Sequence, residues 1–443
     1  MLTSESGFPE WLPADRLVEQ AFIDTIRQQF ELYGFAPLET RAVEPVDVLL
    51  AKGETDKEIY VLSRLQADED EPDEASLGLH FDLTVPFARF VTENQGRLTF
   101  PIRRYQIQKA WRGERPQAGR FREFYQADID IIERGDLPIT ADLELIQALH
   151  DVVNALPVPR VRIHLNNRKL LEGFYRALGI EDIQETLRIA DKLDKVGADG
   201  VRAMLIESGL GEAAADACLA LSTIQSGDAA TIRERVAALG QTHDLLDEGL
   251  AELAFVLEGV RTAHPDDIIA DLSIARGLDY YTGTVVEGKF ADIPDFPTVC
   301  SGGRYDNLAA GKGDEKLPGM GVSIGITRIL SKVLAEGHLR ASRRTPSCVL
   351  VALVDEETRQ QSSAVAYALR QRGIPCEVYN TPDRFGKQIR YADRMGIPFV
   401  WFPGTDGADE VKDIRSGDQS PADPASWEPP AEDWHVRIEE VEP

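Results

Sequence analysis

Cysteine is scarce in this sequence. Only Cys218, Cys300, Cys348 and Cys376 occur among 443 residues, and no two of them have a paired spacing. This pattern argues against a disulfide framework and against a cysteine-based zinc site, and it favours a reducing compartment. The seven histidines are equally scattered, so we expect ordinary surface and core residues and no metal site.

Long hydrophobic runs are also missing. The stretch 348–354 is among the longest, and it falls far short of the ~18 apolar residues that a membrane helix needs. Residues 1–10 lack the basic stretch followed by an apolar one that marks a secretory signal. We therefore expect a cytoplasmic protein that does not enter a membrane.

Basic side chains are too few to balance the acidic ones: 48 Lys and Arg face 75 Asp and Glu, a net charge of −27. Taken alone, this charge disfavours a nucleic-acid partner, but net charge says nothing about a local site. Much of the acid lies in 68–74 and after Gly417, which we predict to be solvated loop and terminus.

One segment, residues 101–122, reverses this balance, with seven basic residues against the single acidic residue Glu114, a local charge of +6. The basic residues are Arg103, Arg104, Lys109, Arg112, Arg115, Arg120 and Arg122. Such a segment in an acidic protein predicts polyanion binding.

Hydrophobic periodicity predicts several domains, as the length already suggests. The expected strands of the first part are 35–43, 59–65, 77–83, 101–107, 124–132, 268–274, 282–287 and 320–326, with helices at 17–32 and 327–336. Between them, residues 166–263 are rich in Ala and Leu with Gly at expected helix ends, which predicts an inserted helical module. After a polar linker at 340–347, strands and helices alternate over 348–402, the pattern of a small α/β domain.

Three segments carry residue types suited to a phosphate-bearing substrate. The loop 112–122 combines arginines, which grip phosphate oxygens through paired hydrogen bonds, with Gly and Pro; a charged surface hairpin is the alternative. Residues 276–283 place an arginine, two tyrosines and two glycines at a strand junction, although a turn with half-buried tyrosines would look the same. The glycines of 318–325 have the wrong spacing for a dinucleotide fingerprint and indicate close approach of a ligand or backbone.

In order and spacing, these segments resemble the motifs of class II aminoacyl-tRNA synthetases: 17–45 resembles motif 1, 105–130 motif 2 and 319–330 motif 3. Narrower signatures are similar to those of the histidyl-tRNA synthetase family. They are the peptides 276–282 with 285–287, and 302–306, the substrate segment 80–86, and the anticodon-domain segments 387–394 and 412–417.

The resemblance implies an α+β multidomain protein. Its core would be an antiparallel sheet of six or seven strands flanked by helices, with a helical insertion and a C-terminal α/β anticodon-binding domain. The corresponding boundaries are 1–165 and 264–339 for the catalytic core, 166–263 for the insertion, 340–347 for the linker and 348–443 for the anticodon domain with its acidic tail.

The resemblance also implies a histidine–tRNA ligase that uses ATP with Mg²⁺, acts on L-histidine and tRNA(His), forms a homodimer through motif 1 and has no tightly bound metal. Arg276 and Arg112 would be catalytic. The residues expected around histidine are Asp82, Leu83, Thr84, Arg112, Gln126, Asp130, Arg276, Tyr280, Tyr281 and Tyr305. The residues expected around ATP are Arg112, Glu114, Arg120, Phe124 and Arg328.

Three other interpretations remain to be weighed. The regulatory subunit of ATP phosphoribosyltransferase keeps the synthetase core as a histidine sensor, but it typically lacks the anticodon domain and the arginines found here at 112, 276 and 328. A tRNA-sensing pseudo-synthetase would normally be fused to a kinase, of which there is no sign. Synthetases for glycine, proline or threonine share the motifs but not the signature at 276–282.

Overall fold

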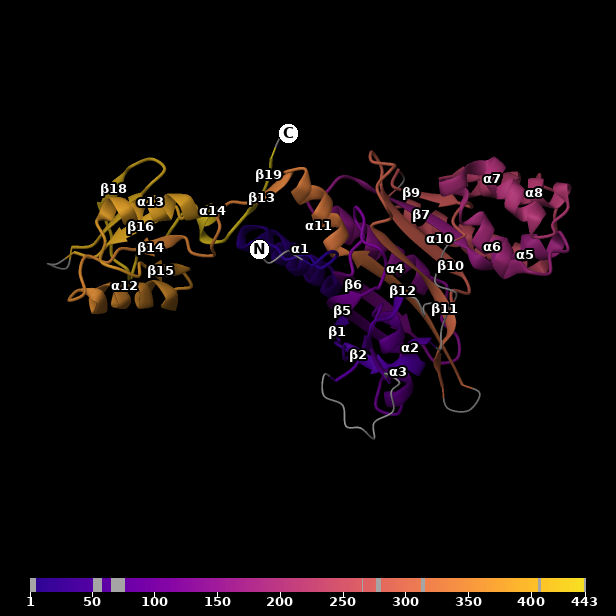
Figure 1. Cartoon of the computed structure of the whole chain (residues 1–443), viewed down its shortest axis with the longest axis horizontal. Helices are drawn as coiled ribbons and strands as arrows, with labels where there is room; N and C mark the ends of the chain where they lie inside the picture. The colour runs from indigo at the N-terminus through magenta and orange to yellow at the C-terminus, as the bar shows by residue number, and fades with distance from the viewer. Residues whose placement is uncertain are drawn as a thin grey trace. The chain divides into compact units, whose positions relative to one another are not determined.

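The computed structural model describes residues 5–50, 58–64, 76–264, 266–275, 280–311, 315–404 and 408–441. The chain divides into two compact units, one formed by Met1–Pro9 with Phe22–Lys332 and the other by Glu10–Ala21 with Val333–Pro443 (Figure 1). Among the described residues, no helix is long and apolar enough to cross a membrane.

A nine-stranded sheet forms the centre of the larger unit, in the order β1-β5-β6-β12-β11-β10-β7-β9-β8. The strands are β1 (Ala36–Pro37), β5 (Ile102–Trp111), β6 (Glu123–Ile132), β7 (Val161–Asn167), β8 (Gln225–Ser226), β9 (Ile268–Asp271), β10 (Thr284–Phe290), β11 (Cys300–Ala310) and β12 (Lys316–Gly325). Within this sheet, and among the residues that the structure describes, only β1–β5 and β7–β9 pair in parallel. The predicted antiparallel sheet with flanking helices is therefore confirmed, although it has nine strands rather than six or seven.

The region expected as one strand at 35–43 is divided between two sheets, because β1 joins the large sheet while β2 pairs with β4. The small sheet consists of β2 (Val43–Pro45), β3 (Val61–Leu62) and β4 (Leu77–Leu79). Its strands are shorter than predicted. The acidic stretch 68–74 lies outside the described residues.

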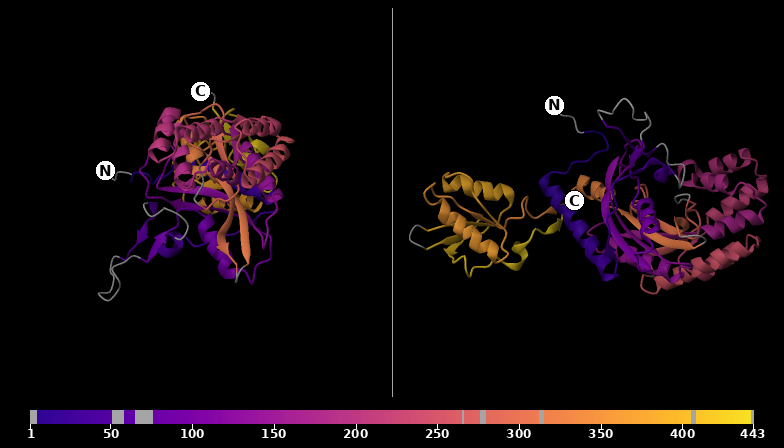
Figure 2. Two further views of the ribbon diagram at one scale, coloured as in Figure 1. Left: turned by 90° about the vertical axis from the view of Figure 1, so that its right-hand side faces the viewer. Right: turned by 90° about the horizontal axis from the view of Figure 1, so that it is seen from below.

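Helices flank the nine-stranded sheet and make up most of the predicted insertion at 166–263. Those assigned wholly to the larger unit are α2 (Val46–Leu50), α3 (Thr84–Asn94), α4 (Thr140–Asn154), α5 (Arg168–Ala177), α6 (Ile183–Ala190), α7 (Leu193–Glu207), α8 (Glu212–Ser222), α9 (Ala229–Ala237) and α10 (Asp244–Arg261). Helices α1 (Pro13–Leu32) and α11 (Ile326–Ala335) each contribute residues to both units. Helices α5 to α8 gather beyond the β7 and β9 side of the sheet (Figure 1), and the right-hand view of Figure 2 shows the same magenta group.

Helices α5 and α10 cross so closely that glycine is required at the contact. A Cβ atom on Gly173 would lie 2.2 Å from the backbone nitrogen of Leu246, and one on Gly249 would lie 2.2 Å from that of Leu170. Since α10 also packs against β7 and β9, this crossing fastens the helical segment to the sheet.

The second unit contains the predicted alternation of strands and helices. Its elements are β13 (Leu339–Ala341), β14 (Val349–Val351), α12 (Arg359–Gln371), β15 (Cys376–Val378), α13 (Phe385–Met395), β16 (Phe399–Phe402), β17 (Glu410–Asp413), β18 (Gln419–Pro421), α14 (Ala431–Trp434) and β19 (Ile438–Glu440). The sheet order is β15-β14-β16-β17-β18, parallel in its first three strands.

The acidic stretch after Gly417 is largely exposed, as predicted, but it has a defined structure and a buried carboxylate, Asp433, that the prediction of a solvated terminus missed. Arg372 donates to the carbonyl of Pro424 at 3.3 Å, and Arg415 forms an ion pair with Asp433 at 2.8 Å. Strand β19 then pairs antiparallel with β13. Arginine contacts with backbone carbonyls and with carboxylates therefore order a segment whose composition alone suggests solvation.

Candidate functional site

Strands β5 and β6 lie side by side in the large sheet, and the basic loop 112–122 joins them. Beside this loop is a pocket of about 90 Å³. It is lined by Arg112, Glu114, Gly119, Arg120, Phe121, Phe124, Gln126, Thr298, Val299, Cys300, Ser301, Ser323, Gly325 and Arg328. Strands β5, β6, β12 and β11 follow one another in the sheet. Their pairing therefore brings residues that are far apart in the sequence to one pocket.

Arg112 is held by its backbone and aromatic neighbours. Its Nε donates to the carbonyl oxygen of Phe81 at 3.0 Å, and its guanidinium carbon lies 5.2 Å from the centroid of the Phe124 ring. This cation–π contact restrains a long side chain beside the pocket. Glu114, in the same loop, forms an ion pair with Arg120 at 3.5 Å.

Arg328 lies in the first turn of α11 and is anchored by carbonyl oxygens. Its Nε donates to Gly119 at 2.7 Å, and its Nη1 donates to Thr298. Burial, together with the positive charges of Arg112 and Arg120, lowers the pKa of Arg328 to about 10. A guanidinium in that position is stabilised by an anion, so the three arginines form a site suited to a phosphate chain.

A second group, made of tyrosines and carboxylates, lies on neighbouring elements. The Tyr280 hydroxyl donates to Asp82 Oδ2 at 3.3 Å, and the Tyr305 hydroxyl donates to Asp130 Oδ1 at 2.7 Å. The Tyr280 ring meets those of Tyr281 and Tyr305 edge to face, with centroids 5.0 and 6.0 Å apart. These contacts fix buried polar groups on a rigid aromatic frame.

Arg104 is the functional neighbour that sequence reasoning missed. It is 1% exposed and forms an ion pair with Asp130 Oδ2 at 2.6 Å, and its Nη2 donates to the carbonyl oxygen of Leu83 at 3.0 Å. Cross-strand register places Arg104 opposite Asp130 and Gln106 opposite Asp128. The alternating side chains of β5 suggested that some polar residues face inward. Only the register between β5 and β6 identifies Asp130 as the partner of Arg104.

Three buried carboxyl groups, those of Asp82, Asp128 and Asp130, lie close to the buried side chain of Arg104. Burial raises the pKa of Asp82 to about 6 and that of Asp128 to about 7, and it also raises the pKa of Asp130. Arg104 acts against burial at both Asp128 and Asp130. The acids outnumber their buried cation, so a positively charged ligand group would be stabilised here.

Polar acceptors at the pocket point to a hydrogen-bonding ligand. Gln126 Nε2 donates to Ser323 Oγ at 2.9 Å, while Gln126 Oε1 is buried without a hydrogen bond to any described residue. An unpaired buried carbonyl oxygen is costly unless a ligand donates to it. Ser323 lies opposite both Ser301 and Asp128 in the sheet; neither serine was among the predicted site residues.

The predicted residues are therefore placed as follows. Arg112, Glu114, Arg120, Phe124, Gln126 and Arg328 line the pocket. Asp82, Asp130, Tyr280, Tyr281 and Tyr305 form the tyrosine–carboxylate group, Thr84 begins α3, and the fully buried Leu83 contributes its carbonyl. Arg276 lies outside the described residues.

The basic segment needs a correction. Arg104 is buried, Arg103 is paired with Glu144 at 2.7 Å, and Lys109 is paired with Glu123. These three are on β5 and are neutralised within the fold, so the positive charge available to a polyanion is confined to the loop 112–122.

Two family models match the chain. The model for histidyl-tRNA synthetase matches residues 7–329, and that for the anticodon binding domain matches residues 347–422. The chain is 53% identical over 445 residues to the histidine–tRNA ligase of Micrococcus luteus, with 97% of each covered. It is equally identical to that of Cutibacterium acnes, with 98% of each covered. The crystal structure of histidyl-tRNA synthetase from Nostoc sp. PCC 7120 superimposes with a TM-score of 0.82 at 33% identity, covering 95% of this chain and 97% of that one.

Proposed function

The chain belongs to the histidyl-tRNA synthetase family, and from this premise we propose how its site joins histidine to tRNA. Membership makes it an aminoacyl-tRNA synthetase, a ligase that activates histidine with ATP and transfers the histidyl group to tRNA, releasing AMP and pyrophosphate. The regulatory-subunit interpretation is not favoured, because relatives about half identical over nearly the full length are histidine–tRNA ligases.

One observation carries the proposal for the site: Arg112 and Arg328 meet at one pocket beside a buried tyrosine–carboxylate group. We propose that the arginines hold ATP and that the acidic group holds histidine. Phe124 would stack on adenine and Glu114 would accept from its amino edge. Arg328, with Arg120 close by, would contact the terminal phosphates.

The chemistry needs alignment more than proton transfer. The carboxylate of histidine is already a nucleophile, and its attack on the α-phosphate accumulates negative charge. Arg112, already oriented by Phe81 and Phe124, would stabilise this charge, and Arg276 is proposed for the opposite side. Mg²⁺ bound with ATP would neutralise the departing pyrophosphate.

Recognition of histidine would rest on paired hydrogen bonds. We place its ammonium group near Asp82 and Thr84, and its ring among Gln126, Tyr280 and Tyr281. Since neutral imidazole has one donor and one acceptor, a site with buried polar groups can reject apolar analogues by about 10⁴-fold or more.

Asp130 acts as a positioning residue in this proposal. Its two oxygens are engaged by Tyr305 and Arg104. It would therefore fix those two side chains around the ligand.

The larger assembly follows the family pattern. We propose a homodimer formed through α1, a helical insertion at 166–263 that holds the acceptor arm with the loop 112–122, and a unit at 348–443 that binds the anticodon. On α13, Phe385 is 41% exposed and would stack on an unpaired base. Because tRNA is charged where translation takes place, we propose the cytoplasm as the location.

Histidine-dependent exchange of labelled pyrophosphate into ATP tests the proposal, with the other amino acids as controls. Arg112→Ala should lower the exchange rate by about 10²-fold, as expected for loss of one transition-state charge contact. Arg115→Ala is the matched control, since it lies in the same loop but not among the residues that line the arginine pocket. Binding of histidine without any exchange would support the sensor interpretation, and equal exchange by the two variants would remove Arg112 from catalysis.

A further inference from the structure

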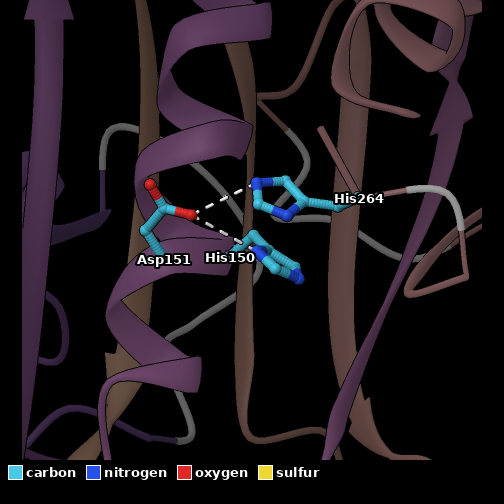
Figure 3. A group of neighbouring side chains, drawn as sticks. All are labelled: His150, Asp151 and His264. Carbon is cyan, nitrogen blue, oxygen red and sulfur yellow. Dashed lines mark hydrogen bonds and ion pairs between the residues drawn. The ribbon is translucent and has the colours of Figure 1, made fainter. Parts of the chain in front are cut away.

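His150, Asp151 and His264 come together (Figure 3), and none of them lines the arginine pocket. The first two lie near the end of α4, and His264 lies between α10 and β9. Each offers a ligand atom, and these atoms lie within 4.8 Å of one another. Among the residues that the structure describes, no other three His, Cys, Asp or Glu side chains meet in this way.

The distances fit a coordination shell better than they fit strong hydrogen bonds. Asp151 Oδ1 lies 3.4 Å from His150 Nδ1 and 3.2 Å from His264 Nε2. Charge-assisted hydrogen bonds are typically about 2.7–2.9 Å long. Zinc bonds of about 2.0–2.1 Å place the ligand atoms of a tetrahedron about 3.3–3.4 Å apart. Both imidazoles also direct a nitrogen toward the same carboxylate oxygen (Figure 3).

Outer contacts orient two of the ligands as in known metal sites. His150 Nε2, the nitrogen turned away from Asp151, lies 3.2 Å from Asp267 Oδ2, the carboxylate–histidine arrangement that fixes a ring for metal binding. Asp267 is itself paired with Arg160. The other oxygen of Asp151 accepts from the Tyr33 hydroxyl.

The ring stack and the end of α4 also bear on the site. The rings of His150 and His264 stack with centroids 3.7 Å apart, so the two imidazoles are held side by side. The end of a helix also attracts a cation, since its free carbonyls carry partial negative charge.

We propose that His150 Nδ1, His264 Nε2 and a carboxylate oxygen of Asp151 bind a divalent transition-metal ion of the zinc type. Two imidazoles and one carboxylate suit zinc and its first-row neighbours and not magnesium or calcium. Asp151 is 38% exposed, so water has access to a fourth position. The ion would join α4 to the connection between α10 and β9, where the helical segment returns to the sheet. The proposal departs from the expectation, drawn from the scattered histidines, that the chain holds no metal site.

Metal titration of the chelator-treated full-length protein tests the site. Zn²⁺ is added in the presence of a competing coloured chelator, without ATP and without histidine, which itself chelates metals. We expect one tight equivalent per chain. His264→Ala should weaken it by about 100-fold or more, and Asp267→Asn, which removes the negative charge of the outer contact, by about 10–100-fold. His338→Ala is the matched control, because His338 also lies against a carboxylate, at 3.0 Å from Glu336, but belongs to no such group.

The metal site and the proposed function are tested by different measurements. Absence of a tight equivalent, or equal binding by wild type and His264→Ala, would overturn the metal site. If His264→Ala does not fold, Asp151→Asn gives the same test at a more exposed position. Co²⁺ should show the strong visible absorption of tetrahedral coordination in the wild type and lose it in the variants. Pyrophosphate exchange is measured separately, so its failure would count only against the ligase mechanism.

Discussion

Asp82 and Asp128 are buried carboxyl groups whose pKa values are raised to about 6 and about 7. A cation bound beside them favours their ionised forms, because opposite charge lowers the pKa of a carboxyl group. The ammonium group of histidine is such a cation, and we place it next to Asp82. Histidine binding should therefore release protons from the site, and affinity should increase as the pH rises through 6 and 7.

The size of this effect follows from the two pKa values. At pH 6.5 Asp128 is about three-quarters protonated and Asp82 about one-quarter, so complete ionisation on binding releases about one proton per site. At pH 8 the same reasoning leaves only about a tenth of a proton. The difference between these two conditions is the signature to look for.

Isothermal titration of histidine in two buffers of different ionisation enthalpy measures the proton count. Free histidine also titrates near pH 6.5, but its contribution is the same for every variant. Asp128→Asn should lower the release at pH 6.5 by about three-quarters of a proton, while Asp136→Asn, at an exposed position, should not alter it. The reasoning is refuted if Asp128→Asn releases as many protons as the wild type.

Two further predictions concern the partners of Asp130. Tyr305→Phe removes a 2.7 Å hydrogen bond and should raise the KM for histidine by about 10-fold, as for loss of a bond to a charged group; an unchanged KM in the exchange assay would contradict this. Arg104→Met leaves a buried carboxylate unpaired and should destabilise the fold by about 3–5 kcal/mol. Thermal unfolding measures this loss, with Arg340→Met as the control because the Arg340 side chain is 68% exposed. Equal Tm values for the two variants would contradict the prediction.

Much of the fold could be predicted because the signals are local. Alternation of apolar residues located β5 and β6, and the loop between them follows from its Gly and Pro. Helical spacing located α13, and the alternation of elements identified the sheet of the second unit. These patterns depend only on residues that are close together in the sequence, so the sequence alone is enough to predict them.

The partners of the buried charges could not be predicted in the same way. Arg104 counted as one of seven basic residues, yet the register between β5 and β6 places it opposite Asp130. Register depends on the whole sheet, so the charge count misjudged which arginines face solvent. His150 and His264 are a similar case, because segments far apart in the sequence bring their rings into contact.

The pairing of β13 with β19 has a consequence for how the second unit could be handled. The strand that leads into this unit lies beside the strand that closes it, with Leu339 opposite Glu440 and Ala341 opposite Ile438. The segment from β13 to β19 therefore has neighbouring ends, and such a segment can be grafted into another chain at a single point. Separating the three residue pairs of β13 and β19 would leave the hydrogen bonds of the five-stranded sheet in place.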